Sequence, residues 1–363
     1  EWERDVFGGR VAPATEAAGN VISWYLEFID NRDLPRGTRD FNGSPRFSTG
    51  YVPIRNRPGI LIETHMIKDY RSRVIGTYDF LRAALNEANR EPARLKQLGW
   101  DADERTVALG RAYDPSRLYP IDFELTEEST PFQLRAFEYQ TDMSEVSGDL
   151  RVVYGREPLD LTVPMYQTFR VSRAVAPPVS YIVPVQWSEV IEVLKAHGLE
   201  THMLYEAKEI EVETYKFTNV IWPAGPFEGR HMPRFDVERT TETRVFHAGS
   251  LIVPMAQPLA KVAINLLEPE APDSFARWGF FNAIFEEKEY GERYVLEALA
   301  REMMATDPAL KVEFEALLAS DADFAASPSE RLRFFHKRSP YWDPQMNLYP
   351  VGRVISVLDL PLV

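Results

Sequence analysis

The clearest periodic pattern in the chain begins at about residue 71. Apolar side chains recur there at spacings of four, three and four residues, at Val74, Tyr78, Leu81 and Leu85. This spacing is typical of the apolar face of a helix, so we predict a helix that continues to about Ala88. The apolar run just before it, residues 58–63, predicts a short buried strand. A strand, a turn and a long helix together indicate an α/β unit.

The middle of the chain has a different pattern. Short runs that alternate apolar and polar residues, such as 132–139 and 150–154, are separated by Gly and Pro. Such alternation predicts antiparallel strands. Further strands are predicted at 209–217 and 242–254, and the chain beyond residue 257 has mostly helical patterns.

Several connections can be predicted from local signals. Residues 21–30 are a short helix or a strand, and residues 31–57 form a long loop rich in Gly, Pro and Arg. Loops of that length are usually functional or disordered. Residues 187–196 predict a short helix that ends at Gly198, a C-cap residue.

These patterns divide the chain into four expected segments. They are an α/β part (residues 1–95), a linker with some helix (96–118), a mainly antiparallel β domain (119–256), and a helical region with an extended tail (257–363). A length of 363 residues is enough for two or three domains.

Composition excludes several classes of function. The chain carries 41 Lys and Arg against 55 Asp and Glu, a net charge of −14, which argues against binding to nucleic acid or to an anionic membrane. It has no cysteine, which excludes disulfides, a thiol nucleophile and thiolate metal ligands. No apolar run has the length of a membrane span. No signal peptide is visible, and the compartment stays open, a secreted or periplasmic location included.

Glu63 and His65 are the first candidates for chemistry. Residues two apart on a strand face the same side, so both could enter one cleft, with Glu63 as a general base or acid. The alternative is a structural pairing of Glu63 with Arg55 or Arg57. Tyr51 could donate a hydrogen bond in the same region, or could simply be a packed aromatic residue.

Five of the arginines in the long loop and at its end form a candidate group, Arg36, Arg39, Arg46, Arg55 and Arg57. Arginine binds carboxylates through two parallel hydrogen bonds, so this group could receive an anionic part of a substrate. The alternative is scattered charge on a solvated loop. We reject His197 and Glu200, with the later His336, as a zinc site, because the pair spans a helix end at a capping glycine.

The segment 51–65, Tyr-Val-Pro-Ile-Arg-Asn-Arg-Pro-Gly-Ile-Leu-Ile-Glu-Thr-His, followed by Arg73-Val74 and the predicted helix, resembles the C-terminal half of zinc carboxypeptidases of the carboxypeptidase A type. Parts of residues 254–274 and 339–343 also look like the C-terminal extension of some bacterial members. The resemblance implies a partial carboxypeptidase-like sheet with a flanking helix. It implies that Glu63 is the general base that activates a zinc-bound water in peptide hydrolysis. Tyr51, Arg55 and Arg57 would contact a peptide or peptide-like substrate, with His65 in the pocket.

The chain departs from this family in its metal ligands. The family's His-x-x-Glu pair and its later His precede the catalytic Glu, whereas the first His of this chain is His65. We therefore assign no metal ligand in this chain. We expect zinc in a larger protein whose ligands lie upstream, and expect this chain alone to be inactive. The alternative is a non-enzymatic binding or structural module.

Overall fold

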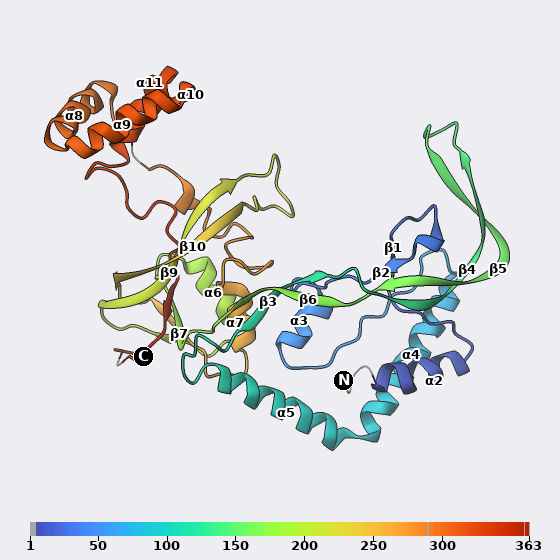
Figure 1. Ribbon diagram of the computed structural model, residues 1–363. Coiled ribbons are helices and arrows are strands. Elements are labelled where there is room, and N and C mark those ends of the chain that lie inside the picture. The colour runs from blue at the N-terminus through green and yellow to red at the C-terminus, as the bar shows by residue number, and fades with distance from the viewer. Residues whose placement is uncertain (1–4, 289, 359, 363) are drawn as a thin grey trace.

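A long helix and a β-ribbon connect two lobes of the chain (Figure 1). The computed structural model describes residues 5–288, 290–358 and 360–362. Helices and several antiparallel sheets are both present, as the sequence predicted in outline. The division into four segments stays a prediction.

The N-terminal lobe is mainly helical. Its elements are η1 (Phe7–Val11), α2 (Ala12–Ala17), β1 (Glu27–Phe28), η2 (Leu34–Arg36), β2 (Thr38–Arg39), α3 (Ser48–Ile54), α4 (Tyr70–Arg90) and α5 (Pro92–Leu109). The helix predicted after residue 70 is confirmed as α4. Asp69 begins it by accepting a hydrogen bond from the Ser72 amide at 3.0 Å, which satisfies one free donor of the first turn. Its residues Phe80 and Ala83 pack on Val6 and Val11 in a small core.

One prediction for this lobe is wrong. Residues 58–63 form no strand but belong to the exposed loop between α3 and α4. No described strand pairs with them, and an extended segment without a ladder partner gains none of the hydrogen bonds that stabilise a sheet. The 18-residue helix α5 runs between the lobes and supplies the helix that was expected in the linker, while the bounds of that linker stay a prediction (Figure 1). In residues 21–30 the only regular structure is the two-residue strand β1.

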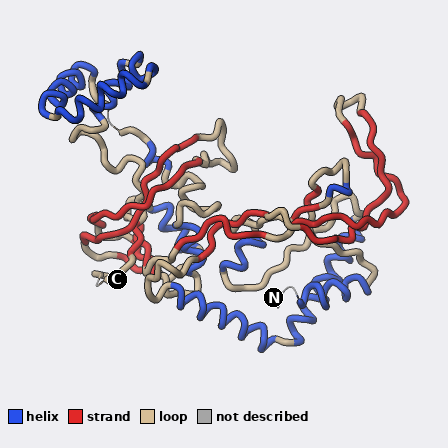
Figure 2. The backbone as a smooth tube through the Cα atoms, in the orientation of Figure 1, coloured by secondary structure: helices blue, strands red, loops and turns tan. Residues whose placement is uncertain are grey.

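One long hairpin, and the antiparallel pair of strands from which it extends, build a ribbon across the molecule (Figure 2). Its strands are β3 (Tyr119–Leu125), β4 (Ser129–Met143), β5 (Leu150–Tyr166) and β6 (Phe169–Val175). β3 pairs antiparallel with β6, and β4 with β5, while β5 also pairs parallel with the short β2. The predicted alternation of residues 132–139 is therefore confirmed as strand. The far end of the β4–β5 hairpin projects from the body of the molecule (Figure 2).

The C-terminal lobe is built on a six-stranded antiparallel sheet. Its elements are β7 (Ser180–Val183), α6 (Ser188–Ala196), β8 (His202–Met203), β9 (Lys208–Ile221), β10 (Arg234–Phe246), β11 (Leu251–Pro254), α7 (Ala260–Leu267), η3 (Asn282–Phe285) and β12 (Gly352–Val354). The strand order is β10-β9-β12-β7-β11-β8, so a strand from the chain's tail lies inside the sheet. The predicted helix α6 is confirmed, and Gly198 follows it with a φ of +81°, the left-handed conformation that favours glycine.

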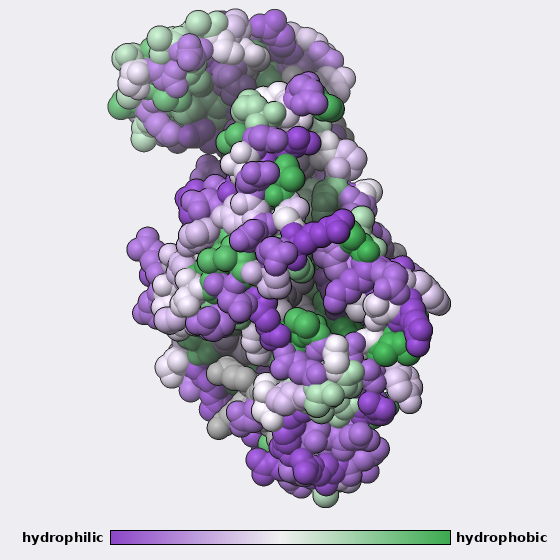
Figure 3. Space-filling model, turned by 90° about the vertical axis from the view of Figure 1, so that its right-hand side faces the viewer, coloured by the Kyte–Doolittle hydropathy of each residue, from purple (hydrophilic) through white to green (hydrophobic). Residues whose placement is uncertain are grey.

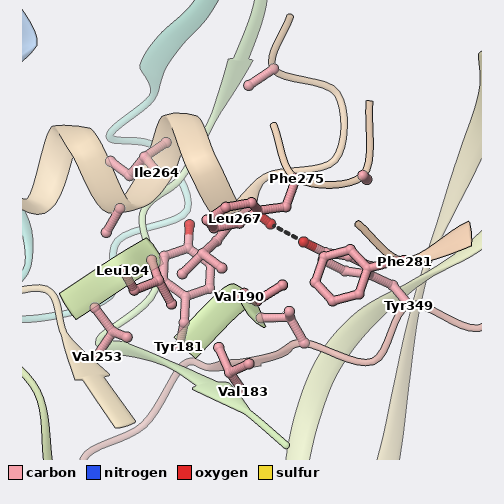
Figure 4. Packing of buried hydrophobic residues seen from close by; sticks show 14 of the residues in the cluster. Tyr181, Val183, Val190, Leu194, Val253, Ile264, Leu267, Phe275, Phe281 and Tyr349 are labelled. Atoms are coloured by element: carbon pink, nitrogen blue, oxygen red, sulfur yellow. Dashed lines mark hydrogen bonds between the residues drawn. The ribbon is translucent and has the colours of Figure 1, made fainter. Parts of the chain in front are cut away.

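The main hydrophobic core lies between this sheet and helices α6 and α7 (Figure 4). Val190 and Leu194 of α6 and Ile264 of α7 are fully buried against Tyr181. The Tyr349 hydroxyl donates to the Leu267 carbonyl at 2.8 Å and ties the tail to the end of α7.

Four helices form a separate bundle beyond the sheet: α8 (Arg293–Thr306), α9 (Pro308–Ser320), α10 (Ala322–Ala326) and α11 (Pro328–His336). The bundle has its own core around Phe314, Phe334 and Phe335. Asp307 and Ser327 cap α9 and α11. The helical prediction beyond residue 257 is therefore confirmed in outline.

Most of the surface in Figure 3 is hydrophilic, with separate hydrophobic patches. The helices of the described chain all fall short of the length and hydropathy that a bilayer span requires.

Candidate functional site

Glu63 and His65 lie in the exposed loop between α3 and α4. None of the hydrogen bonds or ion pairs among the described residues involves Glu63. The Nδ1 atom of His65 accepts a hydrogen bond from the Ile67 amide at 3.2 Å, which closes a local turn. The argument that both side chains face one cleft depended on a strand and is wrong, but the carboxylate of Glu63 is free to meet solvent or a ligand.

Tyr51 lies within α3 and Arg55 ends that helix, and both contact the C-terminal lobe. The Tyr51 hydroxyl is 2.7 Å from Nδ1 of His197, the residue that ends α6. Arg55 Nη1 donates to the same hydroxyl at 3.0 Å and to the His197 carbonyl at 3.4 Å. Since an arginine can only donate, the Tyr51 oxygen accepts from Arg55 and its proton is available to a neutral His197 ring. Burial, and then the charge of Arg55, lower the pKa of His197 and favour that neutral form.

Asn56 is the centre of the next contact. It has a left-handed backbone, with a φ of +59°, and is 8% exposed. Its amide nitrogen donates to Asp103 Oδ1 and Thr106 Oγ1, both at 3.0 Å, and to the Pro258 carbonyl at 3.1 Å. Its amide oxygen accepts from Lys261 Nζ at 2.8 Å. One buried amide therefore joins α3 to α5 and to α7.

Arg57 completes this contact with a bidentate pair. Its two terminal nitrogens donate to the two carboxylate oxygens of Asp103 at 3.0 and 2.9 Å. Burial would raise the pKa of Asp103, but hydrogen bonds from Arg57 and Asn56 outweigh it and hold that pKa below its usual range. Burial, and then the charge of Arg105, lower the pKa of Lys261. We call Tyr51, Arg55, Asn56 and Arg57, with their partners His197, Asp103, Thr106, Pro258 and Lys261, the α3 junction.

The other arginines of the long loop have separate partners. Arg36 pairs with Asp30, and Arg39 pairs with Glu27. Arg46 reaches the C-terminal lobe, where it pairs with Glu228 at 2.8 Å and lies over the rings of Phe227 and Trp278, at 5.1 and 5.3 Å. The five arginines therefore form no common anion site, and Arg46 is a second link between the lobes.

The sequence analysis missed a buried polar cluster in the C-terminal lobe. Glu268 accepts hydrogen bonds from the hydroxyls of Tyr181 at 2.5 Å and Tyr215 at 2.6 Å, and from Arg353 Nε at 2.9 Å. Arg353 also donates to Glu213 at 2.6 Å. Burial, and then the charge of Glu268, raise the pKa of both tyrosines and keep their hydroxyls protonated. A carboxylate directly after the mostly apolar segment 262–267 was a sequence signal for a buried acid.

The described residues do not fit a zinc ion. Among them there is no group of three or more His, Asp or Glu side chains that could hold a metal. The ring of His197, which the sequence analysis rejected as a ligand, is used in the contact with Tyr51. The zinc that the family resemblance implies therefore has no binding site that can be assigned in this part of the chain.

Comparison with known proteins gives a partial similarity. The chain is 31% identical over 108 residues to Carboxypeptidase 2 of Trichophyton tonsurans and, to the same extent, to Carboxypeptidase 2 of Trichophyton equinum. The matched region is 28% of this chain and 19% of each fungal protein, so the chain spans about a fifth of the length of these relatives. No family model and no solved structure matches the chain. The chain thus contains a region that is similar to part of a carboxypeptidase.

Proposed function

We propose that the chain belongs to a metallocarboxypeptidase-like hydrolase of peptide or related amide bonds, with Glu63 as general base. The observation that carries this proposal is the 31% identity to the two fungal proteins named Carboxypeptidase 2. The family resemblance of residues 51–65 points to the same broad activity, that of a carboxypeptidase.

The exposed position of Glu63 supports the proposed role. A general base must be within hydrogen-bond reach of the proton that it removes. Glu63 is exposed and has no hydrogen-bond or ion-pair partner among the described residues, so its carboxylate is available to take a proton from water. It would then return that proton to the leaving amine. Because the described residues do not fit zinc, we derive no step through the metal and assign no ligand for it.

The test compares Glu63→Gln with the unchanged protein, prepared in the form that its native source contains. The intact mass of that native form, measured against 41.7 kDa, decides which polypeptide is expressed. We expect hydrolysis of blocked dipeptides by the unchanged protein, and a fall in kcat/KM of about 10²–10⁴-fold in the variant. Glu104→Gln, which changes another exposed carboxylate, should leave the rate unchanged. Full activity of Glu63→Gln would remove Glu63 from this role.

A second candidate is a non-enzymatic binding or structural module. It is favoured by the α3 junction, in which Tyr51, Arg55 and Arg57, the proposed substrate contacts, already bond to protein groups. This candidate predicts no hydrolysis by the native form with zinc supplied, and the same result for Glu63→Gln.

A further inference from the structure

We propose that the C-terminal lobe positions the loop that carries Glu63, through the α3 junction, and that Lys261 is a positioning residue for that carboxylate. The inference rests on the proposed role of Glu63 but concerns a different part of the molecule. Under this proposal the C-terminal lobe belongs to the candidate site, because it sets the position of Glu63.

The junction fixes the start of the loop. Gly59 comes three residues after Asn56, and Glu63 comes seven residues after it. Asn56 is held by groups from α5, from α7 and from the Pro258 carbonyl just before α7. The left-handed backbone at Asn56, a conformation that asparagine adopts more readily than most other non-glycine residues, sets the direction in which the chain leaves α3.

The C-terminal lobe supplies two groups to this amide, the Pro258 carbonyl as an acceptor and the Lys261 ammonium as a donor. The Lys261 Nζ atom lies 2.8 Å from Asn56 Oδ1, and the lysine is half-buried, so the hydrogen bond is shielded from solvent. The Asn56 amide oxygen also lies 3.1 Å from the Thr106 hydroxyl, so loss of the Lys261 ammonium removes the one charged donor to this oxygen and leaves Thr106 as its remaining donor. A hydrogen bond to a charged group contributes about 1.5–3 kcal/mol, so its loss weakens the restraint on the Asn56 side chain. Asp103 accepts hydrogen bonds from both Asn56 and Arg57. A displacement of the Asn56 side chain in a Lys261 variant would therefore also disturb Arg57, the residue that follows Asn56.

The loop itself has few restraints of its own. No backbone hydrogen bond of residues 59–64 is found among the described residues, and Ile60 and Leu61 are exposed. The position of Glu63 therefore depends on the two ends of the loop and on Ile62, which is half-buried and packs on the core of the N-terminal lobe. The N-cap of α4 at Asp69 fixes one end, and the α3 junction fixes the other.

The chain suits a distance measurement because it has no cysteine. Two nitroxide labels on Leu61→Cys and Lys195→Cys, both exposed positions, report the position of the loop relative to the C-terminal lobe. The labelled protein is compared with the same protein carrying Lys261→Met, which keeps the aliphatic stem and removes the ammonium. Lys208→Met, at an exposed lysine of the same lobe, is the matched control.

We expect Lys261→Met to broaden or shift the distance distribution, and Lys208→Met to leave it unchanged. In the unlabelled native form, kcat of Lys261→Met should fall about tenfold to a hundredfold with little change in KM, because a misplaced base slows chemistry more than binding. Lys261→Arg, which restores a donor, should recover part of kcat. Unchanged circular dichroism would show that the variant has folded.

An unchanged distance distribution in folded Lys261→Met would overturn the inference. The inference would also be overturned if Lys261→Met and Lys261→Arg lost kcat equally and both variants were less stable. A purely structural role of Lys261 predicts that result. Failure of the proposed function appears separately, as full activity of Glu63→Gln. The distance measurement then still decides whether the C-terminal lobe positions the loop.

Discussion

Removal of Arg353 tests how strongly the buried polar cluster stabilises the C-terminal lobe. The side chains of Arg353 and Glu268 are each only 1% exposed, and their charged groups lie 2.9 Å apart. Arg353→Met replaces the guanidinium with an apolar chain. It leaves the carboxylate of Glu268 in the core with only the hydroxyls of Tyr181 and Tyr215 as donors.

The expected loss of folding free energy in Arg353→Met follows from the burial of Glu268. Breaking a buried ion pair by removing one partner costs about 3–5 kcal/mol, because the other charge stays without compensation. The two tyrosine hydroxyls still solvate Glu268, so we expect a loss near the lower end, about 3 kcal/mol. With a urea m-value of about 2–3 kcal/mol/M, the unfolding midpoint should fall by about 1–1.5 M.

The control is an arginine that reaches the same cluster from solvent. Arg239 lies 3.8 Å from Glu213 and its side chain is 42% exposed. Pairs of this kind contribute about 0–1 kcal/mol, so Arg239→Met should shift the midpoint little. Urea unfolding is followed by circular dichroism and by tryptophan fluorescence, and coincident curves would support a single transition. If Arg353→Met shifts the midpoint no more than Arg239→Met does, the reasoning about burial is refuted.

Two further predictions concern the contact between the lobes. A β-carbon added at Gly110, the C-cap of α5, would lie 2.0 Å from the Met255 carbonyl oxygen, so Gly110→Ala should lower the free energy of unfolding by about 1–3 kcal/mol. Thermal unfolding checks this against Gly8→Ala, where nothing lies within 4 Å of the added carbon. Burial and Arg55 lower the pKa of His197 from 6.5, so its neutral form is favoured in the folded protein. Its stabilisation is complete above about pH 6.5 and is lost as the pH falls through that value toward the lowered pKa. Urea midpoints between about pH 5 and 8 should therefore fall less steeply with acid in His197→Gln than in the unchanged protein, and equal slopes would contradict the argument.

Local sequence patterns were sufficient to predict the elements whose hydrogen bonds join residues close together along the chain. The spacing of Val74, Tyr78, Leu81 and Leu85 predicted α4, and Gly198 marked the end of α6. Helical hydrogen bonds and caps join residues within four or five positions, so their signals lie in the segment itself. The strands β4, β5 and β9 were also indicated by alternation or by apolar runs. The single strand expected at residues 242–254 is wrong, because a turn divides that segment between the end of β10 and β11.

Contacts between distant residues were beyond local patterns. The strand expected at residues 58–63 failed because a strand needs a partner, and no described segment provides one. β12 pairs with β7 and β9 although about 170 and 140 residues separate them, and nothing in its three residues marks a central strand. The contacts of the candidate site also join distant residues, so local patterns in the sequence did not predict them.

The sequence by itself determined that Tyr51, Arg55, Arg57 and Glu63 are close along the chain and carry polar groups suited to a site. Only the tertiary structure decided how these groups are used. Tyr51 meets His197 146 positions away, and Asn56 meets Lys261 205 positions away, while Glu63 stays exposed. The reason is physical: a hydrogen bond depends on distance and direction in space. Separation along the chain sets neither once the backbone has folded back on itself.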